Sequence, residues 1–118
     1  MTVRSLTFTV ARPFIYTYFV RGNTLKSVNI GICGLGTVGS GTLNLLQRNA
    51  QLINHRANCE IIVSQVGARR DNPDCDTSSV QVSRDIFDVA KNPDIDIVVE
   101  LIGGTTVARD LVMTALEN

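Results

Sequence analysis

The sequence lacks several features that define whole classes of protein. No apolar run reaches the roughly 20 residues of a membrane-spanning helix, because Arg12 and Pro13 interrupt the aromatic-rich stretch near the N-terminus. The same stretch has no small-residue cleavage site, which argues against a secretory signal. The three cysteines, Cys33, Cys59 and Cys75, form no CxxC pair, so we expect neither a zinc site nor a disulfide framework. We therefore expect a cytoplasmic protein with reduced thiols, no metal and no membrane partner.

Acidic residues are absent from the first 27 positions, although the formal net charge of the 118-residue chain is zero. Residues 28–118 hold all 11 acidic residues and have a net negative charge. This second part shows no basic stripe interleaved with aromatic residues, so we expect no nucleic-acid partner.

The acid-free residues 1–27 are open to two interpretations. A leader that contains Arg, Ser and Thr but no acid is typical of organelle transit peptides. Alternatively, the segment is upstream sequence translated from a start codon set too early, since 25–27, "LKS", stands where a Met-Lys-Ser start would be natural. We favour the second interpretation, which sequencing of the native N-terminus tests. In either case we expect a disordered leader over 1–27 and a domain over 28–118.

From residue 28 onwards, short apolar runs alternate with amphipathic stretches. This pattern predicts an α/β fold, a Rossmann-type doubly wound parallel sheet. The helix predicted last is a crossover with no strand after it, so we expect the sheet to be incomplete at the C-terminus and the chain to be the first part of a larger α/β protein. The predicted strands are 28–33, 60–66, 80–83 and 95–102, and the predicted helices are 37–54, 84–91 and 105–118.

A complete GxGxxG motif follows the first predicted strand and opens the first predicted helix. In this setting the pattern indicates a phosphate-binding turn for a dinucleotide. Gly34 allows the tight turn, Gly36 lets the backbone approach a pyrophosphate, and Gly39 lets the helix pack closely on the strand. The candidate cofactor-binding residues of the motif are Gly34, Leu35, Gly36, Thr37, Val38 and Gly39.

The end of the second strand bears on the choice between NAD and NADP. An acid there would accept hydrogen bonds from the ribose 2′-OH, whereas an arginine accommodates a 2′-phosphate. The strand ends in "VGARRD", so Arg69 and Arg70 stand where an acid is usual. We favour NADP, because guanidinium groups can bind a dianionic phosphate bidentately. NAD stays possible, since Asp71 could accept a ribose hydroxyl if the strand ends later.

A second candidate patch is the stretch "ELIGGTT", Glu100 to Thr106, in which the candidate cofactor-binding residues are Gly103, Gly104, Thr105 and Thr106. It closes a predicted strand and so lies at the carboxyl edge of the sheet, where ligands bind in doubly wound folds. The glycines would allow close approach, and a threonine could contact phosphate or ribose. The alternative, a plain turn in which Thr105 or Thr106 caps the next helix, is equally consistent with the sequence.

Groups able to transfer a proton are scarce. The single histidine, His55, falls at the far end of the first predicted helix, and Lys26 and Lys91 lie on the amino side of strands. A dehydrogenase needs a proton donor or acceptor at the reacting carbon. We therefore assign no catalytic residue.

Two stretches carry a family resemblance, "VNIGICGLGTVGSGTLNLLQRN" and "DIDIVVELIGGTTVARDLVMTALEN". Together they resemble the N-terminal region of homoserine dehydrogenase, over about residues 26–118. The resemblance implies an NAD(P)-dependent oxidoreductase that interconverts L-homoserine and L-aspartate 4-semialdehyde in threonine and methionine biosynthesis, with a homo-oligomeric full-length protein. By position it implies that Gly34 to Gly39 contact the pyrophosphate, Arg69 and Arg70 the 2′-phosphate, and Gly103 to Thr106 the ribose and nicotinamide side.

The resemblance also implies that the catalytic and substrate-binding residues belong to later parts of the family's sequence. We therefore expect this chain to bind NADP(H) without turning over homoserine. Two alternatives stay open at this stage: a non-catalytic Rossmann module that binds a nucleotide or a partner, and a fragment of another NAD(P)-dependent oxidoreductase.

Overall fold

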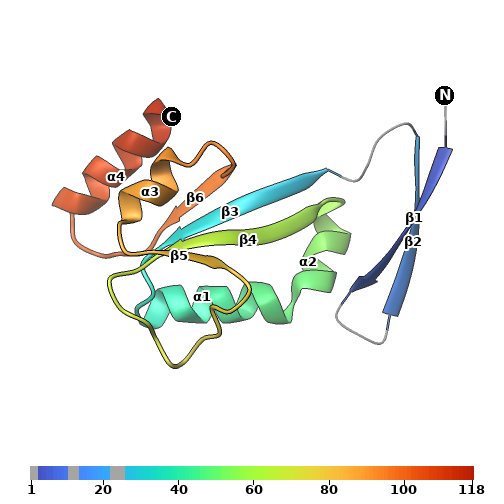
Figure 1. Ribbon diagram of the computed structural model, residues 1–118, viewed down its shortest axis with the longest axis horizontal. Coiled ribbons are helices and arrows are strands. Elements are labelled where there is room, and N and C mark those ends of the chain that lie inside the picture. Colours follow the sequence, from blue (N-terminus) through green and yellow to red (C-terminus); the bar gives the residue numbers. More distant parts are fainter. Residues whose placement is uncertain (1–2, 11–13, 22–25) are drawn as a thin grey trace.

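The structure, a computed structural model, describes residues 3–10, 14–21 and 26–118 (Figure 1). Its main sheet has four parallel strands in the order β5-β4-β3-β6. The central strand β3 has a neighbour on each side, so the chain reverses its direction of winding after β4 and β5. The prediction of a doubly wound parallel sheet is confirmed. The strands of this sheet are β3 (Ser27–Cys33), β4 (Glu60–Gly67), β5 (Gln81–Ser83) and β6 (Ile97–Glu100).

Helices cover both faces of this sheet (Figure 1). Helices α1 (Thr37–Arg48) and α2 (Ala50–Ala57) lie on one face, and α3 (Ile86–Lys91) and α4 (Thr106–Glu117) lie on the other. The last four residues of β3, 30–33, are apolar and buried, as expected of a central parallel strand covered on both faces. Each face of the sheet therefore has its own core.

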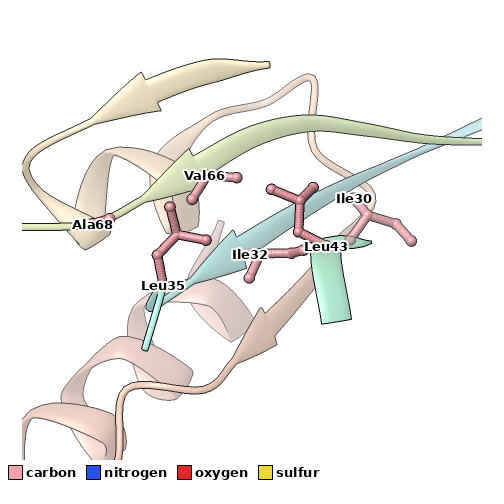
Figure 2. Packing of buried hydrophobic residues seen from close by; sticks show 6 residues of the cluster. All are labelled: Ile30, Ile32, Leu35, Leu43, Val66 and Ala68. Atoms are coloured by element: carbon pink, nitrogen blue, oxygen red, sulfur yellow. The ribbon is translucent and has the colours of Figure 1, made fainter. Parts of the chain in front are cut away.

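Alternate residues of β3 enter the two cores. Ile30 and Ile32 face α1, where Leu43 is fully buried against them. Figure 2 shows this cluster, to which β4 and the turn after β3 also contribute. On the opposite face, Cys33 packs with Val89 of α3 and Leu111 of α4. The end of β3 is thus fixed from both sides, which positions the turn that follows it. The six side chains in Figure 2 are Ile30, Ile32, Leu35, Leu43, Val66 and Ala68.

The prediction of one helix over residues 37–54 is wrong, because two helices divide this stretch at Asn49. The backbone of Asn49 leaves the helical region, with φ −105° and ψ 18°. Both its N–H and its side-chain Nδ2 donate to the carbonyl of Leu45, at 3.0 Å each. A side chain that hydrogen-bonds the backbone of its own helix in this way disfavours helix continuation. The second helix ends at Ala57 and is followed by the C-cap residue Asn58, whose φ of 54° is left-handed.

Other predicted elements exist but begin or end elsewhere. Helix α3 starts at Ile86 rather than residue 84, because the Asp85 carboxylate accepts the Phe87 N–H and caps it. β6 is shorter than the predicted 95–102. On its N-terminal side the Asp96 carboxylate accepts the Asn29 N–H, and on its C-terminal side Glu100 accepts the Ile102 N–H. The remaining limits shift by one residue: β3 starts at 27, β4 ends at 67, β5 starts at 81, and α4 spans 106–117.

The N-terminal strands form a sheet of their own. β1 (Val3–Val10) pairs antiparallel with β2 (Phe14–Arg21), and neither is a strand of the parallel sheet. The parallel sheet starts at Ser27, one residue before the expected domain. The expectation of a disordered leader over 1–27 stays a prediction, and its residues 1–2, 11–13 and 22–25 lie outside the described ones.

Candidate functional site

An open cleft of about 870 Å³ lies at the carboxyl ends of β3, β4 and β6. This is the edge where the winding reverses, and in open α/β sheets ligands bind in the crevice at such a switch point. The sequence-predicted residues that line the cleft are Gly34, Leu35, Gly36, Arg69, Arg70 and Gly103. The predicted residues that are not among its lining are Thr37, Val38, Gly39, Gly104, Thr105 and Thr106.

The turn after β3 has the geometry that its glycines suggested. Gly34 has a φ of +105°, and a Cβ there would lie 2.7 Å from the Leu101 carbonyl oxygen. Its N–H donates to the Gly67 carbonyl at 2.8 Å, which joins the turn to the end of β4. A Cβ on Gly39 would lie 1.8 Å from the Gly34 carbonyl oxygen, so α1 packs directly on the turn. Glycine is therefore required at Gly34 by the left-handed backbone and the nearby carbonyl, and at Gly39 by the nearby carbonyl.

Gly36 lies in open space, in contrast to Gly34 and Gly39, because an added Cβ would meet no atom within 4 Å. It is exposed at the N-cap of α1, with φ −72° and ψ −158°, and no side chain caps this helix end. The first N–H groups of a helix lack partners within the helix and carry the positive end of its dipole. The turn can therefore accept an anion such as a pyrophosphate close to the backbone.

Arg69 and Arg70 are both exposed and both line the cleft next to the end of β4. Across residues 26–118, neither is joined to a carboxylate by an ion pair. The neighbouring acid differs, since Asp71 Oδ1 binds Arg84 Nη2 at 2.6 Å. Two guanidinium groups are thus available to an anion, while Asp71, which follows them in the sequence, already has a cationic partner.

The patch at residues 103–106 only partly joins the cleft. Gly103 and Gly104 both have positive φ, 74° and 77°, so the chain turns sharply after β6. Gly103 lines the cleft together with Val107, at the start of α4. Thr105 is the N-cap residue of α4, but its side chain makes no capping hydrogen bond. The threonine hydroxyl is therefore not committed to the helix end.

Glu100, a half-buried acid at the end of β6, is the first residue of the second candidate patch. Its Oε1 accepts the N–H of Ile102 at 2.7 Å, which fixes the turn towards Gly103. It also lies near the thiol of the fully buried Cys33. Burial first, and the Glu100 charge second, raise the pKa of the Cys33 thiol from 9.0 to about 11.

The shifted pKa of Cys33 predicts a loss of stability at high pH. Between pH 9 and 11 the unfolded chain ionises the thiol while the folded chain keeps it protonated, so the free energy of unfolding falls as pH rises. This contribution is fully present below pH 9, and its full size is about 2–3 kcal/mol. Urea denaturation from pH 8 to 11 should show a shallower decline for Cys33→Ala than for the wild type. Cys59→Ala is the control and should follow the wild-type slope, and parallel curves for all three proteins would contradict the prediction.

The cleft also contains residues that the sequence reasoning did not select, among them Asn72 and Arg84. Arg84 follows β5 and binds both Asp71 and the Ala68 carbonyl, the latter at 3.3 Å. Its position directly after a strand end was a signal that could have identified it. Asn72 stands in an irregular loop, and no pattern in the sequence marked it.

The histidine and the two lysines considered for proton transfer are not part of the cleft lining. His55 is on α2, Lys91 is the last residue of α3, and Lys26 precedes β3, and none of the three lines the cleft. Residues 26–118 bring no three His, Cys, Asp or Glu side chains into an arrangement that could hold a metal ion. None of the helices in this described part of the chain has the length and apolarity of a membrane span.

The doubly wound sheet, the glycine turn and the cleft at its switch point define a dinucleotide-binding α/β domain of Rossmann type. A family model described as the NAD binding domain of homoserine dehydrogenase matches residues 34–118. The chain belongs to this homoserine dehydrogenase family and carries its NAD-binding domain, so its cofactor class is a nicotinamide dinucleotide.

Relatives and solved structures agree with this family. The chain is 60% identical over 94 residues to the homoserine dehydrogenase of Pseudomonas aeruginosa. It is 44% identical over 96 residues to that of Methylobacillus glycogenes. Each match covers 80% of this chain but only 22% and 23% of the relatives.

Among solved structures, homoserine dehydrogenase of S. aureus matches with a TM-score of 0.71 and 31% identity, over 80% of this chain and 24% of that one. The enzyme from Thiobacillus denitrificans matches with a TM-score of 0.67 and 46% identity, over 78% and 22%. The chain thus spans about a quarter of the length of these proteins.

Proposed function

We propose that the chain is the NADP(H)-binding part of a homoserine dehydrogenase, which interconverts L-homoserine and L-aspartate 4-semialdehyde. The observation that carries the preference for NADP is the charge at the end of β4, where two arginines line the cleft without an acidic partner within residues 26–118 and Asp71 is engaged by Arg84. A ribose 2′-OH needs an acceptor at this place, whereas a 2′-phosphate needs cations.

The residues present fit a dinucleotide that lies across the switch point. Gly34 to Gly39 would hold the pyrophosphate at the N-terminus of α1, with Gly36 as the point of closest approach. Arg69 and Arg70 would hold the 2′-phosphate. The segment from Gly103 to Thr106 would follow the ribose and nicotinamide side, where its two left-handed glycines keep side chains out of the way. The bound nicotinamide supplies hydride transfer.

The rest of the proposal rests on the family resemblance carried by residues 26–118. It includes a role in threonine and methionine biosynthesis, a small-molecule substrate bound only by the full-length enzyme, and a homo-oligomeric full-length protein. Three free cysteines support a cytoplasmic location. We assign no catalytic residue within residues 26–118, because the cleft lining includes no histidine or lysine and its carboxylates, Asp71 and Asp85, bind Arg84 and the Phe87 N–H.

Titration calorimetry with NADPH and NADH tests the proposal directly. We expect the 118-residue chain to bind NADPH at least about tenfold more tightly than NADH, because one charge-assisted contact to the 2′-phosphate is worth about 1.5–3 kcal/mol. We also expect no NADP-dependent oxidation of homoserine by the chain alone. Equal affinity for both cofactors would remove the NADP preference, and binding of neither would overturn the nucleotide site. Turnover of homoserine would show that a catalytic group has been missed.

A further inference from the structure

Asn72 connects the loop after β4 to the glycine turn. It is half-buried at the wall of the cleft. Its Nδ2 donates to the Leu35 carbonyl oxygen at 2.7 Å, and its Oδ1 accepts the Asp74 N–H at 2.9 Å. Because both ends of the carboxamide are engaged, the side chain has one defined orientation. It therefore acts as a rigid bridge between two loops that are 37 residues apart in the sequence.

The contact with Leu35 has a consequence for the next residue. The Leu35 carbonyl and the Gly36 N–H belong to one planar trans peptide, so they point in opposite directions. A hydrogen bond that fixes the carbonyl also fixes where the N–H points. Gly36 can adopt many backbone conformations, so this peptide could otherwise rotate. Among the described residues the Gly36 N–H has no hydrogen-bond partner, and the space around Gly36 is open.

Leu35 restrains the same peptide from the other side. Its side chain is 7% exposed and packs in the core shown in Figure 2. The buried side chain holds the Cα of Leu35 in place but does not prevent rotation of the peptide group between Leu35 and Gly36. The Asn72 hydrogen bond opposes that rotation.

We propose that Asn72 is a positioning residue for the cofactor: it holds the Leu35–Gly36 peptide so that the Gly36 N–H is presented to the pyrophosphate of the dinucleotide. The inference rests on the proposed nucleotide-binding function and names a residue that acts through the turn rather than by contact with the cofactor. Orientation set before binding reduces the cost of ordering the site when the ligand arrives.

The same loop offers a matched control. Asn44 of α1 donates from Nδ2 to the Asp74 carbonyl at 2.8 Å, so it also holds the loop but has no contact with the Leu35 peptide. Asn44→Ala removes a loop tether of similar type and leaves the orientation of Gly36 unchanged. A role of Asn72 in loop stability alone would make the two alanine variants equivalent.

NMR titration of the 118-residue chain tests the proposal with two ligands: the dinucleotide that the wild type binds more tightly, NADPH or NADH, and adenosine, which has no phosphate. For Asn72→Ala we expect dinucleotide affinity to fall about five- to tenfold, the size of one hydrogen bond, and adenosine affinity to stay within about twofold. Asn44→Ala should stay within about twofold for both ligands. The Gly36 amide signal should shift on dinucleotide binding in the wild type and much less in Asn72→Ala.

A second variant serves if Asn72→Ala does not fold. Asn72→Asp keeps the acceptor for the Asp74 N–H but cannot donate to Leu35, and we expect it to lose dinucleotide affinity at least as strongly. Unchanged dinucleotide affinity in either folded variant overturns the proposal, as does an equal loss for both ligands. If the wild type binds neither NADPH nor NADH, the proposed function fails, an outcome visible before any variant is compared.

Discussion

Replacing Gly39 with alanine should abolish dinucleotide binding and lower the free energy of unfolding by about 1–3 kcal/mol. A Cβ at this position would lie 1.8 Å from the Gly34 carbonyl oxygen and 2.7 Å from its carbonyl carbon. Both atoms are backbone, so no side-chain rotation relieves the overlap. Either α1 moves away from the turn or the turn itself deforms, and both changes disrupt the site proposed for the pyrophosphate.

Gly41 provides the control, because it lies two residues further along the same helix. An added Cβ there meets nothing within 4 Å. Gly41→Ala should therefore raise the free energy of unfolding by about 0.5–1 kcal/mol, since alanine favours the helix, and should leave cofactor affinity unchanged. Urea denaturation and calorimetric titration of both variants measure the two effects. Wild-type affinity and stability in Gly39→Ala would show that α1 does not pack on the turn as described.

The glycine turn was predictable from the sequence because its requirements are local. A buried strand, three glycines at fixed spacing and a helical pattern follow one another within about twelve residues. The left-handed φ of Gly34 and the close approach at Gly39 agree with the geometric requirements expected of them. The cofactor contacts assigned to these residues stay predictions, since geometry alone does not show binding.

The limits of helices and strands were less predictable because single side chains decide them. The apolar spacing continues through Asn49, yet the Asn49 backbone leaves the helical region and its side chain adds a second hydrogen bond to the Leu45 carbonyl. At Asp85 and Glu100 a carboxylate accepts a backbone N–H two residues ahead and sets an end in the same way. Such hydrogen bonds between a side chain and the backbone depend on the side-chain conformation, which the apolar periodicity does not report.

The wall of the cleft depends on contacts between distant residues, and here the sequence was least informative. Asp71 was expected to be a possible ribose acceptor, but its carboxylate binds Arg84, 13 residues further on. The Asn72 side chain donates to the carbonyl of Leu35, which lies 37 residues earlier in the chain. Neither contact follows from the composition of a loop rich in Asn, Asp and Pro, because only the fold brings β5 and the glycine turn next to it.

Replacing Arg69 and Arg70 together with alanine should lower NADPH affinity by about 100-fold and leave NADH affinity within about twofold. Both side chains are exposed, line the cleft and, among the described residues, have no acidic partner. Their removal therefore leaves no buried charge unpaired, and the loss measures contacts to the 2′-phosphate. We assign a binding free energy of about 1.4 kcal/mol to each contact between an exposed guanidinium and the 2′-phosphate, which corresponds to a tenfold change in affinity.

Arg56→Ala is the matched control, because Arg56 is an exposed arginine of α2 that does not line the cleft. It changes the net charge without touching the proposed 2′-phosphate site, so NADPH affinity should change by less than about twofold. Calorimetry at two salt concentrations separates contact from general attraction, since screening weakens only the latter strongly. Equal weakening of NADPH and NADH in the double variant would mean that the arginines attract the cofactor without reading its 2′ position. A wild type that prefers NADH would instead make Asp71 the recognition residue, which requires Arg84 to release it.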